Sequence, residues 1–578
     1  MPSAAKRPPP APGPRTLELV LLAALAVALL AWWAGRGVER PVPDPGGERV
    51  DCVSYAPFHR PGETPFDPSN RVTRERVRDD LSRLSAITDC VRTYSIDQGL
   101  DEVPSVARDL GMRVLLGVWL GRDRDKNEVE LQRALALAQG HADTVRALVV
   151  GNEVLLRGEL AESELIELAE RAKRTLDVPV TYADVWEFWL RHPRLADAVD
   201  SVTVHVLPYW EDEPVAVEGA VDHVFTVYAR VQRAFPGREI LLGETGWPRA
   251  GRQRRSAVPG RVEQARFVRG FVDAAAEHGL PYNLIEAFDQ PWKRRLEGAM
   301  GGYWGLFDSA GARAFPWHGP VNADPHWRDG PIGALAGGLA FALLAAYALR
   351  RRALAGRAAG VRFVLAQALA GGAAGALLVA QWRDAVHWNQ DWTHELPAMA
   401  GALATIGYAW LATHRLSQPH GAGAPGPVPG VFGALFAHRG RSVDAAAAAA
   451  LVPWADRGLG VLRFGFLFAA AMSVVLLVFD ARYRGFPWAS FAMPMAMQAL
   501  LALRGERWPH DAREERALGI VLLVGAALAL TQETLANTQA IVFLGGLVLF
   551  ALACGGAPRS RTSTSIPSSA PNAEGANE

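Results

Sequence analysis

The sequence predicts an α/β protein in which a (β/α)8 TIM barrel is fused to a polytopic α-helical membrane domain. Eight short apolar runs alternate with helix-like stretches over residues 45–330, and long apolar segments dominate residues 332–555. Alternating strands and helices are typical of a parallel sheet, and eight repeats in about 280 residues favour a closed barrel. An open doubly wound sheet is the alternative architecture for residues 45–330.

The predicted strands are short apolar runs separated by amphipathic stretches. The runs lie at residues 51–56, 88–94, 113–119, 147–152, 178–183, 200–207, 239–244 and 283–288. Between them, apolar residues recur at a spacing of three to four, as in Val77, Leu81 and Leu84, which predicts helices. The first run continues into Tyr55-Ala56-Pro57-Phe58 and not into a glycine-rich phosphate loop, so a nucleotide-binding sheet loses support.

Apolar segments at both ends of this region predict membrane crossings. Residues 17–36 follow Lys6, Arg7 and Arg15, and we expect an uncleaved transmembrane anchor, with a cleaved signal peptide as the alternative. The region 332–555 is expected to hold seven transmembrane helices, at 332–349, 363–381, 397–414, 459–479, 487–503, 517–534 and 538–555.

The basic residues of the loops predict the orientation in the membrane. Arginines collect in the loops around 350–362, 438–441 and 504–516 and after residue 556, all of which fall on one side of the predicted crossings. By the positive-inside rule that side is cytoplasmic, as are residues 1–16 and the tail 556–578, which we expect to be disordered. The barrel is then expected outside the cytoplasm. Sixty basic and sixty acidic residues cancel, so nucleic acid is not an expected partner.

Cys52 and Cys90 lie at the starts of the first two predicted strands. In an exported domain they are able to form a disulfide. Two buried thiols are an equal alternative, because the sequence does not give the distance between them.

Two glutamates close apolar runs at positions that suit one active site. Glu153 and Glu244 are 91 residues apart, and three strand-helix units of a barrel take roughly 94 residues. Both are therefore expected at the same rim, three strands apart. A neutral and an ionised carboxyl together cleave a glycosidic bond, so the pair predicts a glycosidase with one glutamate kept protonated. The alternative is that two surface glutamates fall near strand ends by chance.

Four segments resemble glycoside hydrolase family 17, which contains β-1,3-glucanases and β-1,3-glucanosyltransferases. They are Gly151-Asn152-Glu153-Val154, His205-Val206-Leu207-Pro208-Tyr209-Trp210, Gly243-Glu244-Thr245-Gly246-Trp247-Pro248 and Trp304-Gly305-Leu306-Phe307-Asp308. The resemblance covers residues 51 to about 320. It implies Glu153 as acid/base, Glu244 as nucleophile of a retaining mechanism, and Asn152 as the residue that holds the sugar 2-hydroxyl.

The same resemblance implies further substrate-binding residues. Tyr209 is expected near the nucleophile, and the remaining cleft residues are Tyr55, Tyr94, Trp247, Trp292 and Lys293. Plant members have a glutamate where this chain has Gln290, which argues against plant-like endo-hydrolysis. The chain looks closer to bacterial membrane-tethered members, for which chain-end trimming or glucan transfer is implied.

These patterns together predict a retaining glycoside hydrolase or transglycosylase that acts on β-1,3-glucan at the periplasmic face of a bacterial inner membrane. No cofactor and no metal are expected. Seven further helices exceed what tethering needs, which suggests docking to a glucan synthase or export complex. The alternative function is a catalytically idle glycan-binding and polysaccharide-export scaffold.

Overall fold

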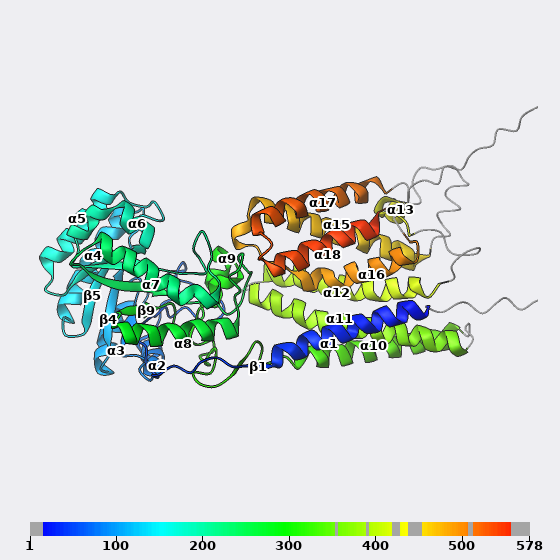
Figure 1. Ribbon diagram of the computed structural model, residues 1–578, viewed down its shortest axis with the longest axis horizontal. Coiled ribbons are helices and arrows are strands. Elements are labelled where there is room, and N and C mark those ends of the chain that lie inside the picture. Colours follow the sequence, from blue (N-terminus) through cyan, green and yellow to red (C-terminus); the bar gives the residue numbers. More distant parts are fainter. Residues whose placement is uncertain are drawn as a thin grey trace, which may run out of the picture.

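The computed structural model describes residues 15–352, 357–388, 392–418, 428–436, 453–506 and 512–555. A barrel and a bundle of long helices lie end to end along the longest axis (Figure 1). Helix α1 (Thr16–Gly37) belongs to the bundle although it precedes the barrel in the sequence.

The barrel is closed and all its strands are parallel. Its strands follow chain order, and the first pairs with the last. They are β2 (Cys52–Ser54), β3 (Cys90–Arg92), β4 (Arg113–Val118), β5 (Val145–Asn152), β6 (Val180–Val185), β7 (Ser201–His205), β8 (Glu239–Thr245) and β9 (Tyr282–Leu284). Each overlaps one of the eight predicted runs. The predicted fold class is confirmed, and the open sheet is excluded.

Amphipathic helices follow the strands and cover the barrel. They are α2 (Arg74–Leu84), α3 (Val103–Asp109), α4 (Arg124–Gly140), α5 (Glu162–Thr175), α6 (Trp186–Arg191), α7 (Val217–Ala234) and α8 (Arg261–His278). Helix α2 shows why such a segment is helical. Thr73 caps its first turn by accepting a hydrogen bond from Arg76 N, and Val77, Leu81 and Leu84 form one buried stripe.

The barrel interior contains a disulfide between Cys52 and Cys90, which joins the first two barrel strands. Of the two alternatives that the sequence leaves open, the structure has the bridge. The sulfurs belong to a small interior cluster completed by Leu115, Ala147, Val149, Ala183 and Leu241. Apolar side chains of several strands thus fill the barrel interior at this level.

A short antiparallel pair lies where the chain enters and leaves the barrel. Strand β1 (Glu39–Arg40) pairs with β10 (Val321–Asn322). The pair brings the end of α1 close to the start of α10 (Asp329–Arg352), and Arg36 donates to Asp324 at 3.4 Å. Two-residue strands have no recognisable periodicity, so the sequence did not predict them.

The bundle contains α1, α10 and seven further described helices. These are α11 (Arg357–Trp388), α12 (Trp392–Leu416), α13 (Val431–Phe436), α15 (Trp454–Phe479), α16 (Trp488–Leu503), α17 (Arg513–Glu533) and α18 (Thr538–Cys554). Within the described residues, five helices are long and apolar enough to cross a membrane: α1, α10, α11, α12 and α15. Helices α16 and α18 are apolar but shorter. All eight predicted crossings are therefore helical, and five of them meet the length and composition of a span.

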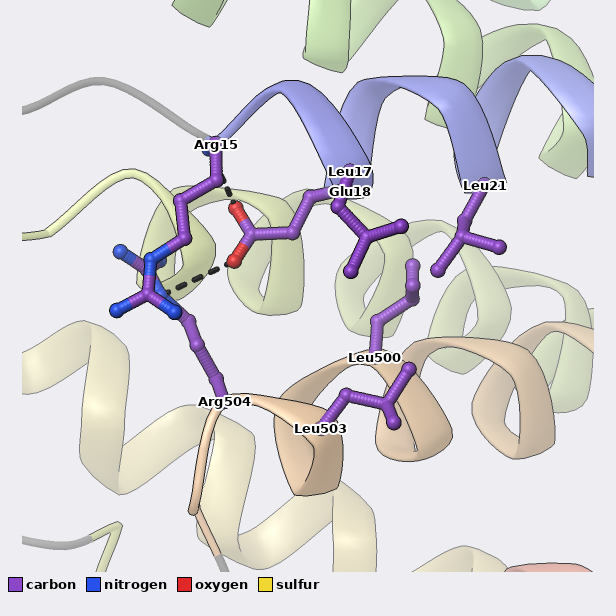
Figure 2. Close-up of a pocket in the computed structure, with 7 residues that line it drawn as sticks. All are labelled: Arg15, Leu17, Glu18, Leu21, Leu500, Leu503 and Arg504. Carbon is purple, nitrogen blue, oxygen red and sulfur yellow. Dashed lines mark hydrogen bonds and ion pairs between the residues drawn. The ribbon is translucent and has the colours of Figure 1, made fainter.

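Buried ion pairs connect the bundle helices at the end away from the barrel. Glu18, the acidic residue within the apolar segment of α1, lies 3.1 Å from Arg504 Nε at the end of α16 (Figure 2). Leucines of both helices line the pocket beside this pair. Arg463 of α15 binds Glu515 of α17 through both carboxylate oxygens, at 2.7 and 3.1 Å. Buried charges need such partners, which explains why these residues occur in apolar helices.

Candidate active site

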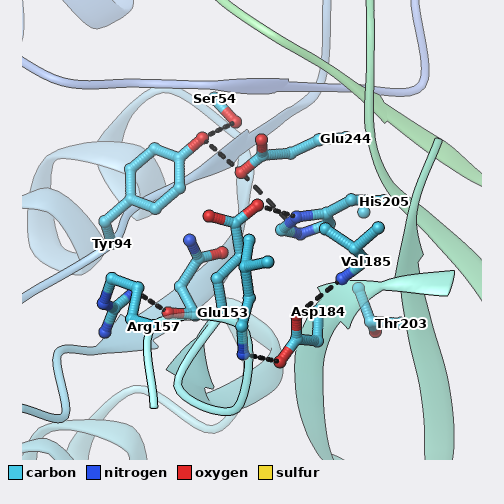
Figure 3. Close-up of polar contacts among 12 residues, drawn as sticks. Ser54, Tyr94, Glu153, Arg157, Asp184, Val185, Thr203, His205 and Glu244 are labelled. Carbon is cyan, nitrogen blue, oxygen red and sulfur yellow. Dashed lines mark hydrogen bonds and ion pairs between the residues drawn. The ribbon is translucent and has the colours of Figure 1, made fainter. Parts of the chain in front are cut away.

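Two glutamates meet at the mouth of the barrel. Glu153 follows β5, the fourth barrel strand, and Glu244 lies in β8, the seventh, as the strand spacing predicts. One carboxylate oxygen of each and a ring nitrogen of His205 all lie within 4.8 Å of one another (Figure 3). The Glu153 side chain is 25% exposed, and that of Glu244 is 6% exposed.

The backbone at Glu153 has an unusual conformation. Its φ is 52°, in the left-handed region that residues other than glycine rarely adopt. The following turn is held from β6, because Tyr182 Oη accepts from Leu155 N at 3.0 Å and Asp184 Oδ2 accepts from Leu156 N at 3.4 Å. Strained backbone of this kind persists where the surrounding contacts over-determine it, and it is concentrated at functional sites.

His205, at the end of β7, lies between the two glutamates. It is 1% exposed, with Nδ1 at 3.1 Å from Glu153 Oε1 and Nε2 at 3.7 Å from Glu244 Oε1. Arg92 Nη1 lies 3.4 Å from Nε2, and a guanidinium only donates. Nε2 is therefore the acceptor, and Nδ1–H donates to Glu153. Gly243 makes room for the ring, since a Cβ there would lie 3.0 Å from it.

Arg92, at the end of β3, is fully buried and joins three strands. Its Nη1 donates to Gly243 O at 2.8 Å and to Glu244 Oε1 at 3.1 Å, and its Nη2 donates to Asn152 Oδ1 at 2.6 Å. The planar guanidinium suits several acceptors at fixed angles. Arg92 therefore orients the Glu244 carboxylate, and it holds the Asn152 amide with its oxygen toward the guanidinium.

Tyr94 also holds Glu244. Its hydroxyl lies 2.8 Å from Glu244 Oε1 and 2.9 Å from Ser54 Oγ. Among the described residues, the hydrogen bonds to the Glu244 carboxylate all engage Oε1. The carboxylate is thus fixed through one oxygen.

The charges around Glu153 keep it ionised. Burial alone would raise its pKa, but the hydrogen bond from His205 and the positive charges of Arg157 and Arg92 hold the pKa below its ordinary value. The sequence analysis expects one of the two glutamates to be protonated. In the free site Glu153 is ionised, so it does not hold that proton. Beneath it, burial and the nearby Glu153 charge raise the pKa of Asp184 to about 6.

Lys293 lies between two further carboxyls that the sequence analysis did not select. Its Nζ is 2.9 Å from Glu286 Oε2, and burial raises the pKa of Glu286 to about 7. Burial also raises the pKa of Glu297 to about 7; Lys293 lowers it, and the charges of Glu153 and Glu244 raise it further. These carboxyls share the electrostatic environment of Glu153 and Glu244.

The predicted aromatic cleft residues fall into two groups. Tyr55, Tyr209 and Trp247 are each fully buried, with Tyr55 Oη donating to Asp80 and the rings of Tyr209 and Trp247 in contact. These three support the cleft from behind and present no free ring face. Trp292 is half-buried and lies edge-on to the exposed Phe66, with 5.4 Å between ring centroids. Phe66 was missed because it lies in a loop that has no pattern.

The cluster of Glu153, His205 and Glu244 has the ligand types of a metal site, but its hydrogen bonds oppose one. Arg92 already supplies a positive charge 3.1 Å from Glu244. The Nδ1–H of His205 points at Glu153, so that nitrogen has no lone pair for an ion. The arrangement fits acid/base and nucleophilic carboxylates.

Arg92, His205 and Asp184 were not among the residues predicted from the sequence. Each interrupts or ends an apolar run that became a barrel strand. A charged residue that is forced into a buried strand end is the signal that would have found them.

Residues 52–305 match the family model described as BtgE/BtgC glycoside hydrolase domain. A putative glucan endo-1,3-beta-glucosidase of Aspergillus niger is 27% identical over 291 residues, which is 45% of this chain and 40% of that protein. A probable family 17 glucosidase of Saccharomyces cerevisiae is 24% identical over 263 residues, covering 44% of this chain and 64% of that protein.

Among solved structures, an active-site mutant of the Rhizomucor miehei β-1,3-glucanosyltransferase in complex with laminaritriose is similar to 48% of this chain and 98% of its own, at 23% identity and a TM-score of 0.41. The chain spans about two fifths of the length of the first curated relatives that it matches.

Arg92→Ala is expected to destabilise the barrel by about 3–5 kcal/mol, because Glu244 and Asn152 lose their buried partner. Thermal unfolding of the full-length protein in detergent measures the change. Arg60→Ala is the control, since Arg60 is exposed and its loss should cost less than about 0.5 kcal/mol. Equal unfolding temperatures for the two variants would contradict the role given to Arg92.

Proposed function

We propose that this protein is a retaining glycoside hydrolase or glucanosyltransferase that acts on β-1,3-glucan, since residues 52–305 match the family model described as BtgE/BtgC glycoside hydrolase domain. The separation of the two carboxylates carries the proposal. In retaining enzymes the pair is about 5–5.5 Å apart, whereas inverting enzymes need about 6.5–9.5 Å to admit a water. One carboxylate oxygen of Glu153 and one of Glu244 lie within 4.8 Å of each other, which favours the closer spacing of a retaining pair.

The first chemical step uses Glu244 as the nucleophile. Its carboxylate attacks the anomeric carbon and forms an ester with the sugar, while the glycosidic oxygen leaves with a proton from Glu153. Arg92 and Tyr94 bind Oε1 of Glu244, so Oε2 is the oxygen assigned to the attack. Arg92 binds the amide oxygen of Asn152, so the amide nitrogen is the group assigned to hydrogen-bond the sugar 2-hydroxyl.

The second step returns the proton. Glu153, now ionised, takes a proton from water or from an acceptor sugar hydroxyl, and the new oxygen displaces Glu244 from the anomeric carbon. Water gives hydrolysis, and a sugar gives transfer. Glu153 needs its proton in the first step, and a bound sugar helps because it buries the carboxyl further and so raises its pKa.

The substrate class is taken from the relatives. The Aspergillus niger protein is named a putative glucan endo-1,3-beta-glucosidase, and its similarity supports β-1,3-glucan as the substrate here. The half-buried Trp292 and the exposed Phe66 form an aromatic edge suited to a sugar chain.

We place the barrel at the periplasmic face of a bacterial inner membrane. Five helices with the length and composition of spans, arginine-rich loops on one side and a disulfide in the barrel support this location. An idle glycan-binding scaffold has less support, because such a protein has no need for the buried Arg92, His205 and Tyr94 contacts around the two glutamates.

Incubation of the full-length protein with laminari-oligosaccharides tests the activity. Transfer yields chains longer than the substrate, and hydrolysis alone yields only shorter ones. Glu244→Ala should lower either turnover by at least about a thousandfold, since the covalent step is lost. Turnover that survives this substitution would remove the mechanism, and an inert wild-type protein would favour the scaffold.

His205→Ala is expected to move the alkaline limb of kcat/KM to higher pH. The limb reports the pKa of the acid in the free enzyme, and His205 lowers the pKa of Glu153 by its hydrogen bond. Removal of His205 raises that pKa, so the protonated form of Glu153 persists to higher pH. His223→Ala is the matched control, because His223 lies on α7 beside Glu211. An unchanged limb, or one moved to lower pH, would contradict this assignment.

A further inference from the structure

The face of the barrel that carries the catalytic pair also contacts the helix bundle. Three loops that follow β7, β8 and β9 meet the turn between α15 and α16, which contains a short 3-10 helix, Ala481–Tyr483. These loops follow the strands that end in His205 and Glu244, and the third contains Lys293. Figure 1 shows α9 (Arg294–Glu297) at the side of the barrel that faces the bundle.

Arg252, from the loop after β8, holds this turn at both ends. Its Nη1 donates to Ala481 O and to Arg484 O, the latter at 3.1 Å. Its Nη2 forms an ion pair with Glu533 of α17, and both side chains are buried. On the barrel side, Tyr209 Oη donates to Arg252 O at 2.6 Å. The guanidinium therefore fixes the turn relative to the loop that follows the nucleophile strand.

Gln253, the next residue of the loop, adds further hydrogen bonds between the barrel and the bundle. Its backbone N donates to Gln539 Oε1 at 2.8 Å, and its Nε2 donates to Ala536 O at 3.0 Å. Asn537 Nδ2 returns a hydrogen bond to Gln253 O at 2.9 Å. A buried set of paired polar groups defines one geometry between two surfaces.

Arg482 and Tyr483 lie between the two carbonyls that Arg252 holds. Arg482 is exposed, and Tyr483 remains 36% exposed although its ring contacts Trp210 edge-on, with 6.1 Å between centroids. Arg482 lies 5.6 Å from the centroid of the Trp210 ring. Part of this surface therefore remains accessible, and it combines the partly exposed Tyr483 with the guanidinium of Arg482.

This surface lies next to the catalytic cleft. A Cβ on Gly298 would collide with Tyr483 O, so the turn touches the residue directly after Glu297. Glu297 in turn is close enough to Glu153 and Glu244 for their charges to raise its pKa. Trp210 lies five positions after His205 and contacts the ring of Tyr209, which itself contacts the buried Trp304.

We propose that Arg482 and Tyr483 of the bundle, together with Trp210 of the barrel, form a glucan-binding subsite, so that the membrane half of the protein completes the substrate cleft. This inference rests on the proposed function. An aromatic ring suits the apolar C–H face of a glucose unit, and the Arg482 guanidinium and Tyr483 hydroxyl suit its hydroxyl groups. The subsite lies beyond the catalytic pair, so only longer chains reach it.

Kinetics of the full-length protein in detergent, on laminari-oligosaccharides from the disaccharide to the heptasaccharide, test the subsite. Tyr483→Leu keeps an apolar side chain but removes the ring. It should raise KM about 3- to 10-fold for the longest substrates and leave the shortest unchanged. Tyr483→Phe should restore most of the loss. The matched control is Phe479→Ala at the end of α15, an aromatic residue that is 85% exposed, and it should match the wild type at every length.

The outcomes separate the inference from the function on which it rests. A wild-type protein that cleaves or transfers glucan, with Tyr483→Leu equal to Phe479→Ala at every chain length, would overturn the subsite alone. An equal loss on short and long substrates would also overturn it, because that pattern reports a disturbed barrel. A wild-type protein without turnover at any length would instead remove the proposed function. Unfolding temperatures within a degree of the wild type are expected for all three variants.

Discussion

One buried guanidinium organises the mouth of the barrel. Arg92 donates to Glu244, to the carbonyl oxygen of Gly243 and to Asn152, and so connects β3, β5 and β8. A buried charge is costly unless it is paired, and both terminal nitrogens of Arg92 have acceptors, which include the proposed nucleophile Glu244. The position of Glu244, the proposed nucleophile, is therefore set by the charge balance of the barrel interior.

The other features of the site follow from this arrangement. Because Arg92 faces Nε2 of His205, the ring donates through Nδ1 to Glu153, and it lowers the pKa of that carboxyl. Glu153 in turn sits on strained backbone that β6 holds in place. Strain, charge and hydrogen bonding thus all act on the residue whose proton must move in both steps.

Much of the architecture was predictable because burial leaves a periodic pattern in the sequence. Buried parallel strands appear as apolar runs, so all eight barrel strands were located, and the spacing of the runs placed Glu153 and Glu244 on one rim. The direction of a side chain leaves no such pattern. Tyr55, Tyr209 and Trp247 follow strands as expected, yet they point into the core. Charged residues inside apolar runs, such as Arg92 and His205, were overlooked for the same reason.

Contacts between the barrel and the helix bundle cannot be predicted from sequence patterns. Arg252 and Glu533 are 281 residues apart, and neither belongs to a motif. The pairing of Cys52 with Cys90 was likewise open, since only coordinates bring the two sulfurs together. Of the eight predicted crossings, α16 and α18 begin and end within one residue of their predicted bounds, and both helices are shorter than a full span.

The stereochemistry of the first product tests the central claim, that Glu153 and Glu244 are close enough for a covalent intermediate on Glu244. A laminari-oligosaccharide whose reducing end has been converted to the alditol gives anomeric hemiacetal signals only from newly released chains. Proton NMR during the first turnovers should show the β anomer first, with the α anomer appearing later by mutarotation. The α anomer as the initial product would mean inversion, and it would contradict the account.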